Sequence, residues 1–83
     1  MYEYNTQGTC SSKIRFDIRD NRVYGLSFTN GCEGNLSGLS ILAEGMEAAE
    51  LIKRLKGVRC GSKKTSCPDQ LARALEKAVK ARP

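Results

Sequence analysis

The four cysteines are the residues best suited to chemistry in this chain of 83 residues, which has no histidine and no tryptophan. They are Cys10, Cys32, Cys60 and Cys67. Cysteine thiolates bind Zn²⁺ or iron–sulfur clusters, and they also exchange with disulfides. The spacing C-x21-C-x27-C-x6-C contains no C-x2-C pair, so a metal site would need ligands from separate segments to converge. The alternative is that the cysteines pack as small hydrophobic residues.

Two stretches in which polar and apolar residues alternate predict a β-hairpin. Its apolar positions are Ile14, Phe16 and Ile18 in one strand and Tyr24, Leu26 and Phe28 in the other. Asp20 and Asn21 tolerate left-handed backbone and predict the turn between the strands. Tyr2 and Tyr4 alternate with polar residues in the same way and indicate a third strand.

Three helices are expected after the hairpin. The first has Asn35 as its N-cap and ends at Gly45, and the second covers residues 46–56 and ends at Gly57. The third begins with Cys67 at the N-cap and Pro68 at the first helical position. Their apolar faces are expected at Leu36, Leu39, Leu42 and Ala43, at Ala48, Leu51, Ile52 and Leu55, and at Leu71, Leu75, Ala78 and Val79.

Strands followed by helices predict an α+β fold that forms one domain over residues 1–83. We expect a small antiparallel sheet of two to three strands, with three helices packed on one face. No apolar run approaches the roughly 20 residues that span a bilayer, and no signal-peptide pattern is present. These features favour a cytoplasmic protein without membrane contact, where cysteines bind metals or act in redox chemistry more often than they form structural disulfides.

The predicted hairpin brings two of the cysteines to the same end of the fold. Cys10 precedes the first hairpin strand and Cys32 follows the second, and antiparallel strands place these positions side by side. If the last helix packs along the sheet, its first residue, Cys67, reaches that end as well. Cys60 is one short loop away from Cys67. The sequence therefore predicts that the four thiols converge on one metal ion or cluster.

The net charge of +5 is distributed unevenly along the chain. Residues 1–52 carry a net charge of −3, whereas residues 53–83 carry +8. The basic half is suited to an acidic protein surface, a nucleotide or a nucleic acid. The bases considered for nucleic-acid contact are Lys53, Arg54, Lys56, Arg59, Lys63 and Lys64. No aromatic residue lies among them, so no platform for stacking bases is visible, and a solvated helix surface is the simpler interpretation.

The run Thr65-Ser66-Cys67-Pro68-Asp69 matches, letter for letter, the motif after which the TSCPD domain is named. Together with Gly8-x-Cys10 and Gly31-Cys32-x-Gly34-Asn35, the resemblance covers nearly the whole chain. The TSCPD domain occurs near the C-terminus of cobalamin-dependent ribonucleotide reductases and in small stand-alone bacterial proteins. The resemblance implies a role as an accessory to ribonucleoside-diphosphate reductase, with that enzyme as a partner. It does not imply catalysis by this chain alone, because 83 residues cannot hold the reductase barrel.

The order of the cysteines also resembles that of the IscU-type iron–sulfur scaffold proteins. That resemblance places Cys10, Cys32 and Cys67 at the three scaffold cysteines that hold a cluster or zinc. Ser12 and Ser66 stand where the scaffold family has aspartate and histidine, respectively. These differences argue against cluster transfer but leave three sulfurs for a metal, with Cys60 as the fourth.

The leading hypothesis is a small cysteine-rich module that binds Zn²⁺ or an iron–sulfur cluster through Cys10, Cys32, Cys60 and Cys67. A second hypothesis is thiol–disulfide exchange between Cys60 and Cys67, which would pass electrons to a ribonucleotide reductase. A third is nucleotide or nucleic-acid binding by the basic half. The sequence shows no carboxylate pair, no Ser/His/Asp set and no phosphate-binding loop, so it offers no carrier for hydrolase or kinase chemistry.

Overall fold

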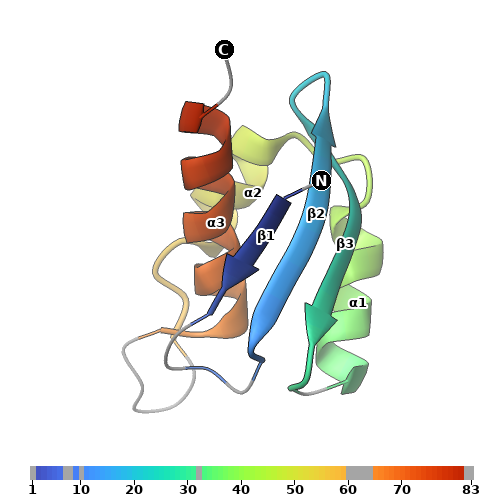
Figure 1. Cartoon of the computed structure of the whole chain (residues 1–83), viewed down its shortest axis with the longest axis vertical. Coiled ribbons are helices and arrows are strands. Elements are labelled where there is room, and N and C mark those ends of the chain that lie inside the picture. Colours follow the sequence, from blue (N-terminus) through green and yellow to red (C-terminus); the bar gives the residue numbers. More distant parts are fainter. Residues whose placement is uncertain (1, 7–8, 10, 32, 60–64, 82–83) are drawn as a thin grey trace.

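The computed structural model describes residues 2–6, 9, 11–31, 33–59 and 65–81. The strands are β1 (Tyr2–Asn5), β2 (Lys13–Arg19) and β3 (Arg22–Thr29), and the helices are α1 (Glu33–Ala43), α2 (Ala48–Leu55) and α3 (Cys67–Ala81). The strands form one antiparallel sheet in the order β1-β2-β3 (Figure 1). The expected α+β arrangement is confirmed, and so is the third strand.

The β2–β3 turn follows from its two residues. Asp20 and Asn21 have φ angles of 52° and 64°, the left-handed backbone that a two-residue hairpin turn requires. The turn pairs Arg19 with Arg22 and Ile18 with Val23. The predicted position of the turn is therefore confirmed.

A β-bulge at Gly25 changes which residues of β3 face the core. The pairing shifts between Arg15 and Asp17, so β3 contains one extra residue, and Gly25 has a φ of +63°. Val23, rather than Tyr24, is therefore fully buried. The ring of Tyr24 instead lies under the Arg19 guanidinium, and Arg19 Cζ is 4.5 Å from the centre of that ring. The prediction of strict alternation through Tyr24 was wrong, because the bulge breaks the two-residue period.

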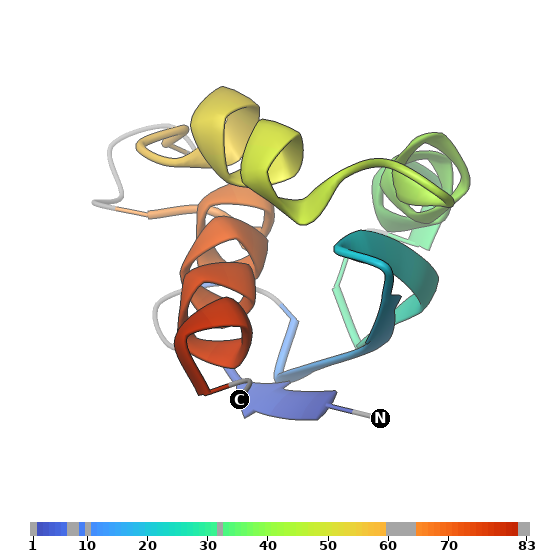
Figure 2. The same cartoon turned by 90° about the horizontal axis from the view of Figure 1, so that it is seen from above.

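One hydrophobic core joins the sheet to all three helices. Its buried members are Ile14, Phe16, Ile18, Val23, Leu26, Ala43, Ala48, Leu51, Leu71, Ala74, Leu75 and Ala78. Seen from above, α3 lies between the sheet and α2, while α1 lies along the edge strand β3 (Figure 2). In the described residues no helix combines the length and the apolar character needed to cross a bilayer.

Two apolar positions that were expected in the core are exposed. Leu42 is 75% exposed. It lies about 120° away from Leu36 around the helix axis, so it points away from the face shared by Leu36 and Ala43. Val79 is 39% exposed, at the margin of the face that Leu71, Leu75 and Ala78 share. The inner face of α3 includes Ala74 in its place.

The helix ends agree with the predictions at the C-termini better than at the N-termini. Gly45 and Gly57 follow α1 and α2 with φ angles of +78° and +90°, as expected for helix stops. Asn35 is not the N-cap of α1, since the helix begins at Glu33.

Candidate functional site

The start of α3 is the point at which three distant segments of the chain meet. Cys67, its first residue, is 7% exposed. Its Sγ lies 3.1 Å from Ser11 Oγ, across 56 residues of sequence. Ser11 is itself only 3% exposed. This contact joins the segment before β2 to the first turn of α3.

The end of the hairpin lies against the same segment. Gly31 has a φ of +100°, and a Cβ built on it would lie 3.1 Å from the Ser11 nitrogen and 2.8 Å from Leu36 Cδ1. Any larger residue would force these neighbours apart, so this close approach requires glycine. Ser12, which follows Ser11, donates its N–H to the Thr29 carbonyl at 2.8 Å. The residue after Cys10 and the residue before Cys32 are therefore in contact.

Ser66, rather than Cys67, caps α3. Ser66 Oγ accepts the Asp69 N–H at 3.1 Å, and the Ser66 carbonyl accepts the Gln70 N–H at 2.8 Å. The prediction that Cys67 occupies the N-cap was wrong by one residue, because the serine hydroxyl is the better acceptor for orphan N–H groups. The cap leaves the Cys67 sulfur available for other interactions.

Ser66 also holds the segment that precedes Cys60. Its hydroxyl donates a hydrogen bond to the Val58 carbonyl at 2.6 Å while it accepts the Asp69 N–H. Val58 is two residues before Cys60 and Ser66 is one residue before Cys67. The residues close to these two cysteines in sequence are thus hydrogen-bonded to each other.

Asp69 is a fully buried carboxylate that joins the two ends of the same segment. It accepts the Gly57 N–H at 2.7 Å, the Thr65 hydroxyl, and Arg73 Nε at 2.9 Å. Burial acts to raise the pKa of Asp69, but the hydrogen bonds from Thr65, Gly57 and Arg73 outweigh burial and hold that pKa below its usual range. Gly57, Thr65 and Arg73 all donate hydrogen bonds to the Asp69 carboxylate, so Asp69 acts as a structural clamp that holds these segments together.

These contacts give three of the five residues in the Thr-Ser-Cys-Pro-Asp run a defined structural task. Thr65 and Asp69 bind each other, and Ser66 caps the helix. The spacing Ser66-x-x-Asp69 resembles a capping box, which is the signal from which this cap could have been predicted. The clamp formed by Asp69 and Gly57 has no comparable signal, because its partner is 12 residues away.

The structure describes one of the four predicted metal ligands. Cys67 lies in the arrangement just described, whereas Cys10, Cys32 and Cys60 are outside the described residues. Among the residues that are described, no group of three or more His, Cys, Asp or Glu side chains could hold a metal ion. The four-thiolate site therefore stays a prediction, and only the sequence neighbours of its cysteines are placed.

Part of the predicted basic surface is neutralised by ion pairs. Arg54 Nε lies 2.7 Å from Glu50 Oε1, and Lys56 Nζ lies 2.9 Å from Glu76 Oε2. Lys63 and Lys64 lie outside the described residues. These pairs reduce the charge that α2 offers to a phosphate backbone, and nucleic-acid binding stays an untested prediction.

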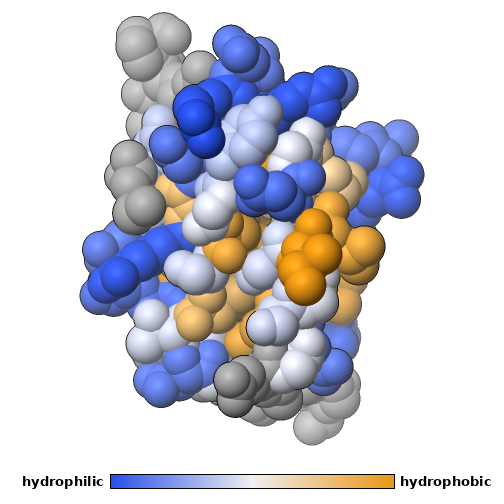
Figure 3. All heavy atoms as spheres, turned by 90° about the vertical axis from the view of Figure 1, so that its right-hand side faces the viewer, coloured by the Kyte–Doolittle hydropathy of each residue, from blue (hydrophilic) through white to orange (hydrophobic). Residues whose placement is uncertain are grey.

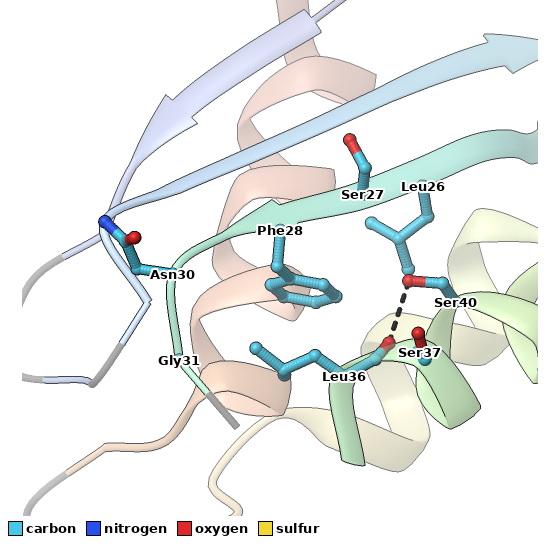
Figure 4. Close-up of a pocket in the computed structure, with 8 residues that line it drawn as sticks. All are labelled: Leu26, Ser27, Phe28, Asn30, Gly31, Leu36, Ser37 and Ser40. Carbon is cyan, nitrogen blue, oxygen red and sulfur yellow. Dashed lines mark hydrogen bonds between the residues drawn. The ribbon is translucent and has the colours of Figure 1, made fainter. Parts of the chain in front are cut away.

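A hollow of about 490 Å³ lies between β3 and α1 (Figure 4). It is lined by Leu26, Ser27, Phe28, Asn30, Gly31, Leu36, Ser37 and Ser40. Phe28 and Leu36 point toward one another, and the Ser40 hydroxyl is bonded to the Leu36 carbonyl at 2.9 Å. None of these eight residues is charged. The hollow therefore offers apolar contact but no group suited to acid–base catalysis.

We expect the stability of the reduced, metal-free protein to fall as the pH drops below the ordinary aspartate pKa of 3.8, partly because of Asp69. A carboxyl group with a lowered pKa in the folded state stabilises the fold above its ordinary pKa, and this stabilisation is lost on protonation. Urea unfolding of the wild type and of Asp69→Asn at several pH values tests the expectation. The gap in unfolding free energy between the two should narrow with acidification, and a constant gap would contradict it.

Comparison with known proteins gives a family but no individual relative. No curated protein and no solved structure matches the chain. The family model described as the TSCPD domain matches residues 2–79, which is nearly all of the 83 residues. The match includes both the Ser11–Cys67 contact and the Thr65–Asp69 cluster. The chain therefore belongs to the TSCPD domain family.

Proposed function

We propose that this protein is a metal-binding module that holds one Zn²⁺ ion or an iron–sulfur cluster through the thiolates of Cys10, Cys32, Cys60 and Cys67. The observation that carries the proposal is the 3.1 Å contact between Cys67 Sγ and Ser11 Oγ. This contact brings the sequence neighbour of one cysteine against the sulfur of another that is 57 positions away in the chain.

Chain connectivity extends the argument to the cysteines next to the contact. Cys10 is bonded to Ser11, and Cys32 is bonded to Gly31, whose backbone packs on Ser11. Consecutive Cα atoms are only about 3.8 Å apart, so each of these thiols is attached one residue from a group that borders Cys67 or Ser11. This connectivity supports Cys10 and Cys32 as ligands beside Cys67.

Cys60 is brought in by the contacts of Ser66 and Asp69. Val58 is hydrogen-bonded to Ser66, and Gly57 is hydrogen-bonded to Asp69, so the chain just before Cys60 lies against the first turn of α3. Thr65, which follows the segment that carries Cys60, is hydrogen-bonded to the same Asp69 carboxylate. Both ends of the segment that carries Cys60 are fixed beside Cys67, which supports Cys60 as the fourth ligand.

Four thiolates suit a closed tetrahedral site for zinc or the ligand set of an iron–sulfur cluster. The positive end of α3 offsets part of the negative charge that such a site gathers. Ser11 Oγ can donate a hydrogen bond to a bound Cys67 sulfur, which would orient the ligand. Such a site would also stabilise a small fold with little core, because metal binding adds to the folding free energy.

The site is proposed to work in the reducing cytoplasm, as an accessory domain of a ribonucleotide reductase. The occurrence of TSCPD domains in those enzymes supports this partner. The four-ligand set leaves no open coordination position for substrate, so the module is proposed to be structural or regulatory and not catalytic by itself.

Titration of the reduced protein with Co²⁺ tests the proposal. Thiolate coordination gives strong charge-transfer absorption, and Zn²⁺ should displace Co²⁺ because it binds such sites more tightly. We expect saturation at about one ion per chain with four thiols protected from alkylation. Unchanged alkylation of all four thiols in the presence of metal would contradict the proposal.

A second candidate, thiol–disulfide exchange between Cys60 and Cys67, is favoured by the Ser66–Val58 hydrogen bond, which closes the segment between them. Two cysteines can be bridged when their Cα atoms are within roughly 7 Å. The 7% exposure of Cys67 argues against it, because a shuttle thiol has to be reached by its partner.

We expect mild oxidation of the metal-free protein to form a Cys60–Cys67 disulfide, because an emptied thiolate site leaves both thiols reactive. Zinc-loaded protein should resist the same treatment. Mass spectrometry after alkylation reports the bond, and Cys60→Ser is the control that cannot form it. If both thiols remain alkylatable after oxidation of the metal-free protein, the exchange reaction has no carrier.

A further inference from the structure

The outward side of α1 is uncharged from Gly34 to Ala43. From Gly34 to Ala43 the sequence contains no acidic or basic residue, although 28% of the chain is charged. Ile41 and Leu42 are each 75% exposed, more than any other large hydrophobic residue that the structure describes. Figure 3 shows the resulting apolar cluster on the side of the molecule that carries α1 and β3. A surface helix normally places charged residues on its outer face, so this pattern is typical of a helix that is covered on both sides.

Two glycines on the same outward face have no role within the described fold. Gly34 and Gly38 are exposed, and a Cβ added to either would meet no atom of the described residues within 4 Å. Glycine inside a helix destabilises it relative to alanine. Gly31 differs, because the fold itself leaves no space for a side chain there. Gly34 and Gly38 therefore weaken α1 without benefit to the isolated chain, which indicates that another backbone approaches them from outside.

The spacing of these residues makes the surface complementary to itself. Gly34, Gly38 and Ile41 are separated by four and three residues, so they lie on one face of the helix, with Leu42 beside them. The N-terminal half of this face has no side chain at Gly34 and Gly38, whereas the C-terminal half carries the exposed side chains of Ile41 and Leu42. A two-fold axis near Gly38 would reverse the second helix and place its Leu42 over Gly34 of the first.

We propose that α1 is a dimerisation surface, which packs against α1 of a second copy of the chain in antiparallel orientation. Such a contact is isologous, since each copy contributes the same two glycines and the same exposed side chains. Glycine at the crossing point allows the two backbones to come close.

The lack of charge on this face suits a second copy better than a partner that binds through charge. Two chains of net charge +5 repel each other, and the uncharged outward face of α1 lets them meet without bringing like charges together. An acidic protein or a nucleic acid would find no base to pair with on this face. The hollow between α1 and β3 is uncharged as well, and it is lined by both apolar and polar residues (Figure 4).

The size of the surface sets the expected affinity. A helix of 11 residues is about 16 Å long, so the contact lies at the small end of specific interfaces. We therefore expect a dimer that forms in the micromolar to millimolar range of chain concentration.

Sedimentation equilibrium of the protein as purified, with a reductant that prevents thiol cross-links, tests the proposal from about 10 µM to about 1 mM. We expect the mass to rise toward that of a dimer. Ile41→Glu should remain monomeric throughout, because two carboxylates would be buried at the contact. Val79→Glu, which changes another exposed apolar residue in the same way, should dimerise like the wild type.

Gly38→Ala separates a dimer contact from a merely structural role. Alanine favours the helix, so the thermal midpoint of the dilute monomer should rise, whereas the added methyl group at the crossing should weaken the dimer about tenfold or more. A monomeric wild type at all concentrations, a dimer that survives Ile41→Glu, or an unchanged dimer affinity in Gly38→Ala would each overturn the proposal.

Discussion

Replacing Cys67 by serine should lower the affinity for Zn²⁺ more than about 100-fold, because the loss of a partner that only orients a ligand already costs about 10–100-fold. Among the four proposed ligands, Cys67 is the one that lies in the described part of the chain. It is buried, it begins a helix capped by Ser66, and its sulfur contacts Ser11. A ligand held so rigidly loses little entropy on binding, and its removal leaves a gap that no neighbour can fill.

Two further variants rank the contributions. Cys60→Ser should cost less than Cys67→Ser, since its segment is fixed at residues 57–58 and 65 rather than at the cysteine itself. Ser11→Ala should lower the affinity about tenfold by removing the hydrogen bond to the bound sulfur. Competition with a chelating indicator measures all three. Equal and negligible losses in both cysteine variants would show that neither thiol is a ligand.

Replacing Asp69 by alanine should produce the largest loss of stability among the side chains around Cys67. The substitution leaves the Gly57 N–H and the Thr65 hydroxyl without their acceptor. A hydrogen bond to a charged group contributes about 1.5–3 kcal/mol, and a domain of this size has little stability in reserve. We expect the variant to be partly unfolded or to melt well below the wild type.

Glu76→Ala is the matched control for that experiment. Glu76 lies on the same helix and pairs with Lys56 at 2.9 Å, but its side chain is 30% exposed. Surface ion pairs of this kind contribute about 0–1 kcal/mol, so the control should unfold close to the wild type. Chemical denaturation followed by circular dichroism gives both values. If Asp69→Ala unfolds like Glu76→Ala, the carboxylate is not a clamp.

Local patterns in the sequence predict most of the fold because those patterns are physically local. Alternation in β2 and the left-handed pair Asp20-Asn21 specify the hairpin without reference to the rest of the chain. The bulge at Gly25 cannot be predicted from local pattern, because distant contacts accommodate the extra residue. These contacts are the pairing with β2 and a hydrogen bond from the Gly25 N–H to Glu44, 19 residues away.

The candidate site divides in the same way. The meeting of the two hairpin ends follows from antiparallel pairing, whereas the position of the start of α3 depends on how that helix packs on the sheet. The described residues Ser11, Gly31 and Cys67 lie together there. The burial of Asp69 does not follow, because sequence alone treats a charged residue in the first helical turn as solvent-exposed and favourable to the helix dipole. The hydrogen bonds that Thr65, Gly57 and Arg73 donate to the carboxylate are what make the burial tolerable.

X-ray absorption spectroscopy of protein purified without oxygen or chelator is the most direct test of the four-thiolate site. The metal edge identifies zinc or iron, and the extended fine structure counts the sulfur atoms bound to it. We predict a first shell of four sulfurs, at about 2.3 Å if the metal is zinc. A first shell dominated by oxygen or nitrogen, or a reduced protein that contains no metal and takes up none when it is added, would contradict the account.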